Sequence, residues 1–394
     1  MDEIKKLSAA FADYILDIRR QLHRHPETSG QEFETTKLIC RELDKLGISH
    51  ITGYKSVGVV GVIRGSLPGS EENAIALRAD MDALPVTEEN QLPYNSEIKS
   101  MMHACGHDGH TAMLLGAAKI LNALRDKFSG TVHLIFQPSE ENGQGAKYMM
   151  RQGDWFEKVN RIFGAHLWMD VPAGKISLED GPRMAAGDLF TIRIHGRGGH
   201  GAQPEKTIDA VVVASALVMN LQSIVSRRYS PLDSAVVTIG SLKAGDTYNV
   251  IAGEAELQGA VRYFDIEKGA EIRKMIEETA THTAAIYGAY VDIDYTQRVP
   301  SVVKNDPSSA ASARRSVAKV LGEDVLTTVS ATMIGEDFSY YLDEKPGCFA
   351  FIGIRNPEKD IVYPHHNPRF NIDEDVLAGG AAVYAQVAID WLTE

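Results

Sequence analysis

Regular alternation between two kinds of apolar pattern is the feature that most constrains the fold of this chain. Helical periodicity alternates with short, strand-like apolar runs, which lie at residues 57–63, 74–77, 131–136 and 162–166. Such runs are typical of strands buried on both faces, and the helices between them then serve as crossovers of a parallel sheet. Helical spacing covers residues 3–24, 32–46 and 107–124. We therefore predict an α/β fold with a mixed, largely parallel sheet flanked by helices.

The pattern changes near residue 184. Between there and residue 297 the expected order is strand, helix, strand, strand, helix, strand, at 188–195, 206–226, 235–242, 254–264, 267–287 and 290–297. This is the order of a ferredoxin-like α+β unit. Mixed α/β patterning returns afterwards, with helices at 307–321 and 373–392 and a strand at 349–352. We expect a discontinuous catalytic domain, residues 1–183 and 298–394, with an inserted domain at 184–297.

Composition narrows the class of protein. The chain has 394 residues and a net charge of −13, which argues against a nucleic-acid partner because such proteins normally present a basic face. Its three cysteines give no disulfide framework, which fits a reducing compartment. The N-terminal residues lack the apolar core of a signal peptide, and no run approaches 18 apolar residues. The expectation is a cytoplasmic enzyme or binding protein with no membrane partner.

One short segment concentrates metal-binding side chains. His103, Cys105, His107 and His110 lie within eight residues, at the start of the expected helix 107–124. Cysteine and histidine are the ligands that transition metals select. In an extended segment Cys105 and His107 would point to the same side. His103 has the same parity and His110 could share a face with His107, so both stay in the candidate set. The alternative is a buried cysteine among surface histidines.

Carboxylates and a further histidine follow other expected strands. Asp80 and Asp82 come after the strand at 74–77, where they would orient a ligand histidine or merely cap a strand. Glu140 and Glu141 follow the strand at 131–136. One could bind metal while the other takes a proton from water, or the pair could be a solvated acidic loop. His166 lies in an apolar strand, where a histidine is either a ligand or a core residue.

The last candidates are His365 and His366, in a segment bracketed by Pro364 and Pro368. Neighbouring side chains diverge in an extended segment, so we expect one of the two at most to bind metal; a surface loop is the alternative. All candidates fall where α/β sheets place ligands, at the carboxyl ends of strands. The set is too large for one tetrahedral ion, and two metals that share a bridging ligand and a water fit it better.

Six motifs, in order along essentially the whole chain, resemble one family. It is the dinuclear metallo-amidohydrolase and metallopeptidase family that includes aminoacylases, carboxypeptidase G and succinyl-diaminopimelate desuccinylase. The motifs lie at residues 78–85, 103–110, 138–141, 198–204, 335–338 and 364–368. The stretch from Ala104 to Asp108 resembles one branch: N-acyl-amino-acid amidohydrolases, hippurate hydrolases and plant auxin–amino-acid conjugate hydrolases.

The resemblance implies roles for individual residues. It implies metal ligation by Cys105, His107, Glu141, His166 and His366. It implies Glu140 as general base and Asp82 as the orienting acid. Asp80 stands near the place where other branches have a ligand histidine, a departure that Cys105 and His107 compensate. The resemblance therefore implies two divalent ions per subunit, with zinc, manganese, nickel and cobalt all open.

The inserted domain resembles the family's lid and dimerisation domain. His200, in a glycine-rich loop, resembles the lid histidine that reaches the partner's active site and stabilises an oxyanion. Asn249 and Arg262 fall where relatives hold a substrate carboxylate, although Arg262 could also be an ordinary surface strand residue. The resemblance implies a homodimer or higher homo-oligomer.

Together these observations predict a metal-dependent amidohydrolase that cleaves N-acyl amino acids into a carboxylic acid and a free amino acid. A dipeptidase or carboxypeptidase of the same family would use the same chemistry. A metal-binding relative without catalysis is the alternative from another functional class.

Overall fold

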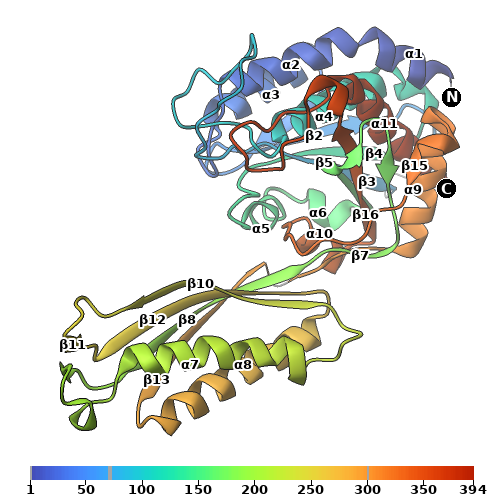
Figure 1. Ribbon diagram of the computed structural model, residues 1–394. Helices are drawn as coiled ribbons and strands as arrows, with labels where there is room; N and C mark the ends of the chain where they lie inside the picture. Colours follow the sequence, from blue (N-terminus) through green and yellow to red (C-terminus); the bar gives the residue numbers. More distant parts are fainter. Residues whose placement is uncertain (1, 70–72, 300) are drawn as a thin grey trace. The chain divides into compact units, whose positions relative to one another are not determined.

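The computed structural model describes residues 2–69, 73–299 and 301–394, and the chain divides into two compact units (Figure 1). The first unit contains Met1–Arg183, Lys304–Ser330 and Asp337–Glu394. The second contains Met184–Val303 and Ala331–Glu336. Its extent differs from the expected range of 184–297, because it also takes in residues 298–303 and a short segment that lies further along the chain.

The first unit is built on an eight-stranded sheet of order β1-β2-β4-β3-β5-β16-β6-β15. The strands are β1 (Ser49–Thr52), β2 (Val59–Arg64), β3 (Ala74–Asp80), β4 (Thr131–Gln137), β5 (Arg161–Pro172), β6 (Ile176–Ser177), β15 (Leu326–Thr327) and β16 (Gly347–Arg355). The four central strands, β4, β3, β5 and β16, are mutually parallel. Antiparallel pairs flank them, between β2 and β4 and between β16 and β6. The predicted mixed, largely parallel sheet is confirmed.

Helices cover this sheet. They are α1 (Asp2–Ala10), α2 (Ala12–Arg24), α3 (Phe33–Lys45), α4 (His107–Ala123), α5 (Gly145–Met149), α6 (Trp155–Lys158), α9 (Pro307–Leu321), α10 (Ser339–Glu344) and α11 (Leu377–Thr393). The single helix expected at 3–24 is wrong: it is two helices that meet at Phe11, whose N–H still donates to Leu7 O (2.9 Å). The apolar spacing continues across this junction, so periodicity alone does not reveal it.

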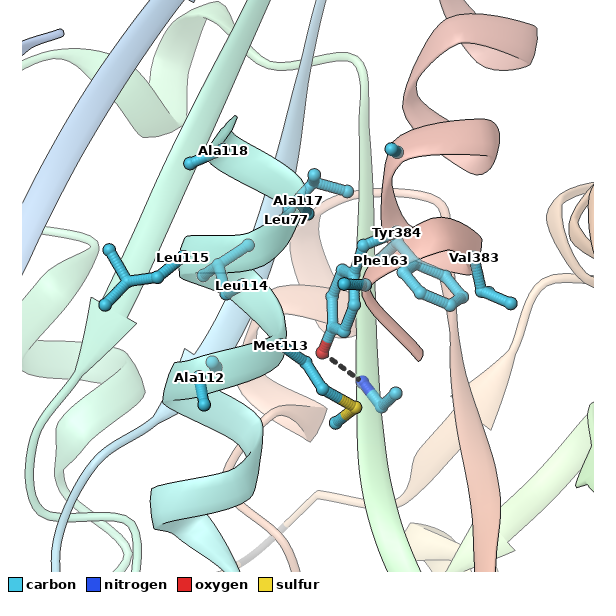
Figure 2. Packing of buried hydrophobic residues seen from close by; sticks show 14 of the residues in the cluster. Leu77, Ala112, Met113, Leu114, Leu115, Ala117, Ala118, Phe163, Val383 and Tyr384 are labelled. Atoms are coloured by element: carbon cyan, nitrogen blue, oxygen red, sulfur yellow. Dashed lines mark hydrogen bonds between the residues drawn. The ribbon is translucent and has the colours of Figure 1, made fainter. Parts of the chain in front are cut away.

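The apolar core between the sheet and its helices contains many side chains of α4 and α11 (Figure 2). In α4, Ala112, Met113, Leu114 and Leu115 are fully buried, because this helix packs on β3 as well as on α2 and α11. Tyr384 of α11 accepts a hydrogen bond from Ala165 N–H (3.0 Å) and donates one to Arg78 O (2.8 Å). One core side chain thus joins β5 and β3, next to the expected site.

The second unit follows the order strand, helix, strand, strand, helix, strand. Its main elements are β8 (Ala186–His195), α7 (Ala210–Ser223), β10 (Ala235–Ala244), β12 (Glu254–Tyr263), α8 (Ile266–Ile286) and β13 (Tyr290–Val299). The sheet has the order β10-β12-β8-β13, every pair is antiparallel, and α7 and α8 pack against it around a separate apolar core. The helix expected from 206 begins at Ala210, because Asp209 Oδ1 accepts the N–H of Val211 (2.9 Å).

Short strands complete the list. β9 (Gly199–His200) pairs with β11 (Val250–Ile251), and β7 (Gly181–Met184) pairs with β14 (Val303–Asn305). Among the described residues, two helices are long and apolar enough to cross a membrane by length and composition alone, Ala210–Arg228 and Glu374–Thr393. The window in Glu374–Thr393 is 72% buried, so its apolar composition is explained by packing in the core.

Candidate metal centre

Five side chains that the sequence singled out as ligands come together in the first unit. The potential ligand atoms of Cys105, His107 and His166 all lie within 4.8 Å of one another. The same holds for Cys105, Glu141 and His366, so the two groups share the cysteine. These residues come from four separate segments of the chain, and a thiol, three imidazoles and a carboxylate converge at one place.

A left-handed glycine sets the direction of Cys105 and His107. Gly106 has φ of 89° and precedes the first residue of α4, His107. A residue with a Cβ is disfavoured in this conformation, whereas glycine adopts it readily. Gly106 lets the turn that carries Cys105 pass directly into α4, so both side chains face the cluster.

His166 lies within β5 and is buried, yet it is not only a core residue. Its Nδ1–H donates to Leu167 O (2.8 Å). The proton is then on Nδ1, so Nε2 carries a lone pair, and this atom lies 3.6 Å from Cys105 Sγ. Burial lowers the pKa of His166 well below its usual value, and the charges of His110 and His365 lower it further. The ring is therefore neutral at physiological pH, which is the form that binds metal.

The two neighbouring histidines near the C-terminus diverge. His366 has φ of 66°, and its N–H donates to Ala104 O (2.8 Å). A non-glycine residue in this region costs about 1–3 kcal/mol and is typically found at functional sites. Its Nε2 lies 3.4 Å from Glu141 Oε1. His365 instead directs Nε2 to Leu167 O (2.9 Å) and packs on Trp168.

Asp82 is the hub that holds the site together. Its Oδ1 accepts hydrogen bonds from His107 Nδ1 (3.2 Å) and Glu140 N–H (3.2 Å). Its Oδ2 accepts from Ser29 Oγ (2.6 Å) and Glu141 N–H (3.0 Å). The bond from Nδ1 fixes the tautomer of His107 and aims its Nε2 at the cluster. Sequence reasoning missed Ser29, for which the only local signal was a polar turn after α2.

Asp80 belongs to a second buried network. Its Oδ1 accepts from His110 Nδ1 (2.5 Å) and its Oδ2 from Arg78 (2.8 Å). Arg78 in turn donates to Asp337 Oδ1 (3.1 Å), which also accepts from Gln137 (2.7 Å). Both Asp80 oxygens thus accept hydrogen bonds from protein donors, and Asp80 also forms a close group of potential ligand atoms with His107 and His110. The strand β3 extends to Asp80, beyond the expected end at residue 77. The signal for this network in the sequence was therefore the two charged residues, Arg78 and Asp80, that continue a buried strand.

The other two histidines of the 103–110 segment, His103 and His110, are both buried but differ in their hydrogen bonds. His110 Nε2 accepts the N–H of Leu167 (2.8 Å), so both of its ring nitrogens are used. His103 is buried, and neither ring nitrogen has a hydrogen-bond partner among the described residues. Burial lowers the pKa of His103 to about 4. Asp108 lies within α4 and pairs with His23 (2.7 Å) and Arg19 (2.9 Å).

The electrostatics of the cluster favour a bound cation. Burial lowers the pKa of His107, but the charges of Asp80, Asp82 and Glu141 outweigh it and raise the pKa to about 10. His107 Nε2 has no hydrogen-bond partner among the described residues and lies 3.9 Å from Glu141 Oε1. Burial and the charges of Glu141, Glu140 and Asp80 raise the pKa of Cys105 well above its usual value. The negative potential of these carboxylates would stabilise a bound cation. A thiol, imidazoles and a carboxylate are ligands that divalent transition metals accept.

Three further residues singled out by the sequence, His200, Asn249 and Arg262, lie in two separate regions of the second unit. His200 of β9 is paired in register with Val250, next to Asn249, whose carbonyl accepts the N–H of Gly201 (2.9 Å). Arg262 lies near the far end of β12, opposite Gly187. Arg262 lies eight positions after Glu254, the first residue of β12, and these eight steps span about 26 Å at about 3.3 Å per residue. His200 and Arg262 are therefore at opposite ends of this unit.

Arg262 sits over a glycine. A Cβ at Gly187 would lie 1.9 Å from Arg262 Nη1, and one at Gly335 would lie 3.3 Å from the same atom. Burial lowers the pKa of Arg262, and the charge of Arg298 adds to this. The guanidinium thus lies close to the backbone at Gly187 and Gly335.

An α/β sheet with an inserted α+β unit and a cluster of thiol, imidazole and carboxylate ligands is typical of metal-dependent hydrolases. Comparison with known proteins identifies the family. The model of peptidase family M20/M25/M40 matches residues 76–390, so the chain belongs to this family, whose members are hydrolases of amide bonds. The resemblance drawn from the motifs is confirmed.

Individual relatives cover nearly the whole chain. Thermostable carboxypeptidase 1 of Saccharolobus solfataricus is 38% identical, over 99% of both chains. N-acetylcysteine deacetylase of Bacillus subtilis is 39% identical, over 96% of this chain and 97% of the relative. Among solved structures, the Bacillus subtilis YXEP protein, described as a dinuclear metal binding peptidase from the M20 family, aligns with a TM-score of 0.85 at 35% identity, over 98% of this chain and 99% of that one.

Proposed function

We propose that this protein is an amidohydrolase that uses two divalent metal ions to cleave N-acyl amino acids into a carboxylic acid and a free amino acid. The observation that carries the proposal is the convergence of two three-residue groups on Cys105, with a further carboxylate beside them. The B. subtilis relative named as an N-acetylcysteine deacetylase, and the solved M20 structure described as dinuclear, support the substrate class and the metal count.

Cys105 would be a metal ligand, and it belongs to both three-residue groups. His107 and His166 complete one group, and Glu141 and His366 complete the other. The metal pair, when bound, supplies the positive charge that polarises an amide carbonyl and lowers the pKa of water towards 7. A thiolate with imidazoles and one carboxylate suits zinc, nickel or cobalt, and manganese remains a candidate because of the carboxylate.

Glu140 would be the general base. Its carboxylate lies in the same close group as His107 and Glu141, so it can reach a water held there. Glu140 takes a proton from the attacking water and then gives it to the nitrogen of the departing amino acid. Asp82 fixes the Glu140 backbone and the His107 ring together, so that base and ligand keep one geometry.

The second unit would act as lid and dimerisation domain. Arg262 would bind the substrate carboxylate bidentately, His200 would stabilise the oxyanion, and Asn249, which lies beside His200, would add a further polar contact to the substrate from that same end. A small substrate is too short to touch both His200 and Arg262 of one second unit, because they lie at its opposite ends. This supports a homodimer, or a higher homo-oligomer, in which His200 serves the site of the partner subunit.

A cytoplasmic location is part of the proposal. Cys40, Cys105 and Cys348 are free thiols, and a cysteine that binds metal must stay reduced.

A carboxypeptidase or dipeptidase is the second candidate, because the S. solfataricus relative carries the former name. The two candidates share the site and differ in what lies on the acyl side of the bond. A panel of N-acetyl and N-benzoyl amino acids, measured beside dipeptides with the same C-terminal residue, separates them by kcat/KM.

The metal requirement and the base are tested together. We expect chelation to abolish turnover of N-acyl amino acids and added zinc, manganese, nickel or cobalt to restore it. Glu140→Gln should lower kcat by about 10²–10⁴-fold, as loss of a general base does. Full turnover in this variant would remove Glu140 from the role. Two bound metals with no hydrolysis of any amide would indicate a metal-binding relative without catalysis.

A further inference from the structure

The turn that carries Glu140 and Glu141 is held by two buried carboxylates, only one of which has been given a role. The N–H groups of Glu140 and Glu141 donate to Asp82. The preceding N–H, that of Ser139, donates to Oε1 of Glu32 (2.8 Å). Three consecutive backbone donors, immediately before and at the expected base, thus end on two acids from different parts of the chain.

Ser139 needs such support because of its backbone. It has φ of 60°, in the left-handed region that residues with a Cβ rarely adopt. Its carbonyl accepts the N–H of Gly145 (3.1 Å), which closes the turn from the other side. If Ser139 relaxed to an ordinary conformation, the chain direction at Glu140 would change, and its carboxylate would leave the cluster.

Glu32 is well placed to hold this conformation. Its side chain is completely buried, and the residue directly precedes α3, with its carbonyl accepting the N–H of Thr36 (3.0 Å). Thr36 Oγ1 in turn accepts the N–H of Gly58 (3.0 Å), which fixes this end of α3 to the segment before β2. A side chain fixed to a packed helix end positions its partner more precisely than one on a free loop.

We propose that Glu32 is a positioning residue for catalysis: by accepting the Ser139 N–H it holds the left-handed turn that aims Glu140 into the metal cluster. The inference rests on the proposed role of Glu140 as base. Burial, with the nearby charge of Asp82, raises the pKa of Glu32 to about 7. A neutral acceptor is therefore tolerated here, and the hydrogen bond matters more than the charge.

The test compares Glu32→Ala, which removes the acceptor, with Glu32→Gln, whose amide oxygen can still accept from Ser139. Glu34→Gln, at an exposed acid in the first turn of the same helix, is the matched control. The first readout is backbone hydrogen exchange of the segment 137–142 in the metal-free protein. The second is kcat and KM for an N-acyl amino acid, with bound metal per subunit measured alongside.

In Glu32→Ala we expect faster exchange at Ser139. We expect kcat to fall about 10–100-fold, as a displacement of roughly 1 Å of a catalytic group does, with KM and bound metal near the wild-type values. Glu32→Gln and Glu34→Gln should stay within about threefold of wild type, far from the loss expected for a misplaced group. Adding Ser139→Gly to Glu32→Ala should restore part of kcat, because glycine adopts this φ without a supporting contact.

Several results would overturn the proposal. Unchanged exchange or unchanged kcat in Glu32→Ala would show that the contact holds nothing. Equal losses in Glu32→Gln and Glu32→Ala would show that charge, and not the hydrogen bond, is what the site needs. If Glu32→Ala does not fold, Glu32→Asp gives the same comparison, because its carboxylate is one methylene too short to reach Ser139. If Glu140→Gln proves active, the base assignment fails, but the exchange measurement still decides whether Glu32 holds the turn.

Discussion

Replacing Asp82 by asparagine is the sharpest perturbation of the site, because it keeps the shape of the side chain and changes only its charge and hydrogen-bonding. All four hydrogen bonds to Asp82 come from donors: His107, Ser29 and two backbone N–H groups. An asparagine has one oxygen, so its NH₂ group must face one pair of these donors. The better orientation turns NH₂ towards Ser29, whose hydroxyl can reverse and accept.

The remaining loss can be estimated from that orientation. The Glu141 N–H is left without its acceptor, and an unsatisfied buried donor costs about 1–3 kcal/mol. The His107 ring keeps its hydrogen bond but loses the neighbouring negative charge. Substitutions behind a ligand histidine typically lower metal affinity by about 10–100-fold, equivalent to about 1.4–2.8 kcal/mol. We expect Asp82→Asn to fall in this range and to lower kcat by a similar factor.

The assay is competition for metal between the protein and a coloured chelator, at fixed neutral pH. Asp306→Asn is the control, because Asp306 caps α9 by accepting Ser309 N–H (2.7 Å) and asparagine caps helices equally well. An affinity of Asp82→Asn within twofold of wild type would refute the hub role of Asp82. An equal loss in Asp306→Asn would show a general effect on the fold.

Three further predictions follow from the same contacts. The pKa values of His107 and Cys105 are both raised, so both side chains hold protons at neutral pH without metal. Metal binding should therefore release about two protons, and metal affinity should increase up to about 100-fold per pH unit. Calorimetry in buffers of different ionisation enthalpy measures the number of protons released. The pKa of Glu32 is raised to about 7, so ionisation of its carboxyl group removes on the order of 3 kcal/mol of stability as pH rises from about 4.5 to 7. The Glu32→Gln variant lacks this loss, so its Tm relative to that of wild type should increase over that pH range. A Tm difference that stays constant with pH would contradict the burial argument. Gly187→Ala should displace the Arg262 guanidinium and raise KM about tenfold or more for substrates with a free carboxylate, consistent with loss of a charge-assisted hydrogen bond, while amidated substrates keep their KM.

The sequence predicted what is local. Strand and helix runs gave the α/β sheet, and the density of histidine and cysteine around residue 105 indicated a metal site, because both signals lie within a few residues. Glycine at 106 likewise marks the start of α4 by its position. The junction of α1 and α2 at Phe11 escaped prediction because side-chain periodicity continues through it.

What escaped prediction depends on pairing between distant segments. Arg78 and Asp337 are 259 residues apart, and nothing in either segment specifies the other. The contact of Glu32 with Ser139 spans 107 residues and exists only once α3 packs beside β2, the strand that pairs with β4. Between His365 and His366, residue spacing left the choice open and the family resemblance pointed to His366; the left-handed backbone at His366, which the flanking prolines do not reveal, separates the two side chains.

The discontinuity of the first unit has a consequence for biosynthesis. Cys105, His107, Glu141 and His166 are translated before the second unit, whereas His366 and α11 come after it. The second unit is largely continuous in sequence and has its own apolar core, so it can fold while the first is still incomplete. On the ribosome, an emerging chain therefore carries a free cysteine and an incomplete set of metal ligands through the synthesis of more than a hundred residues. Loading with the correct metal has to wait until the last segment has joined the sheet.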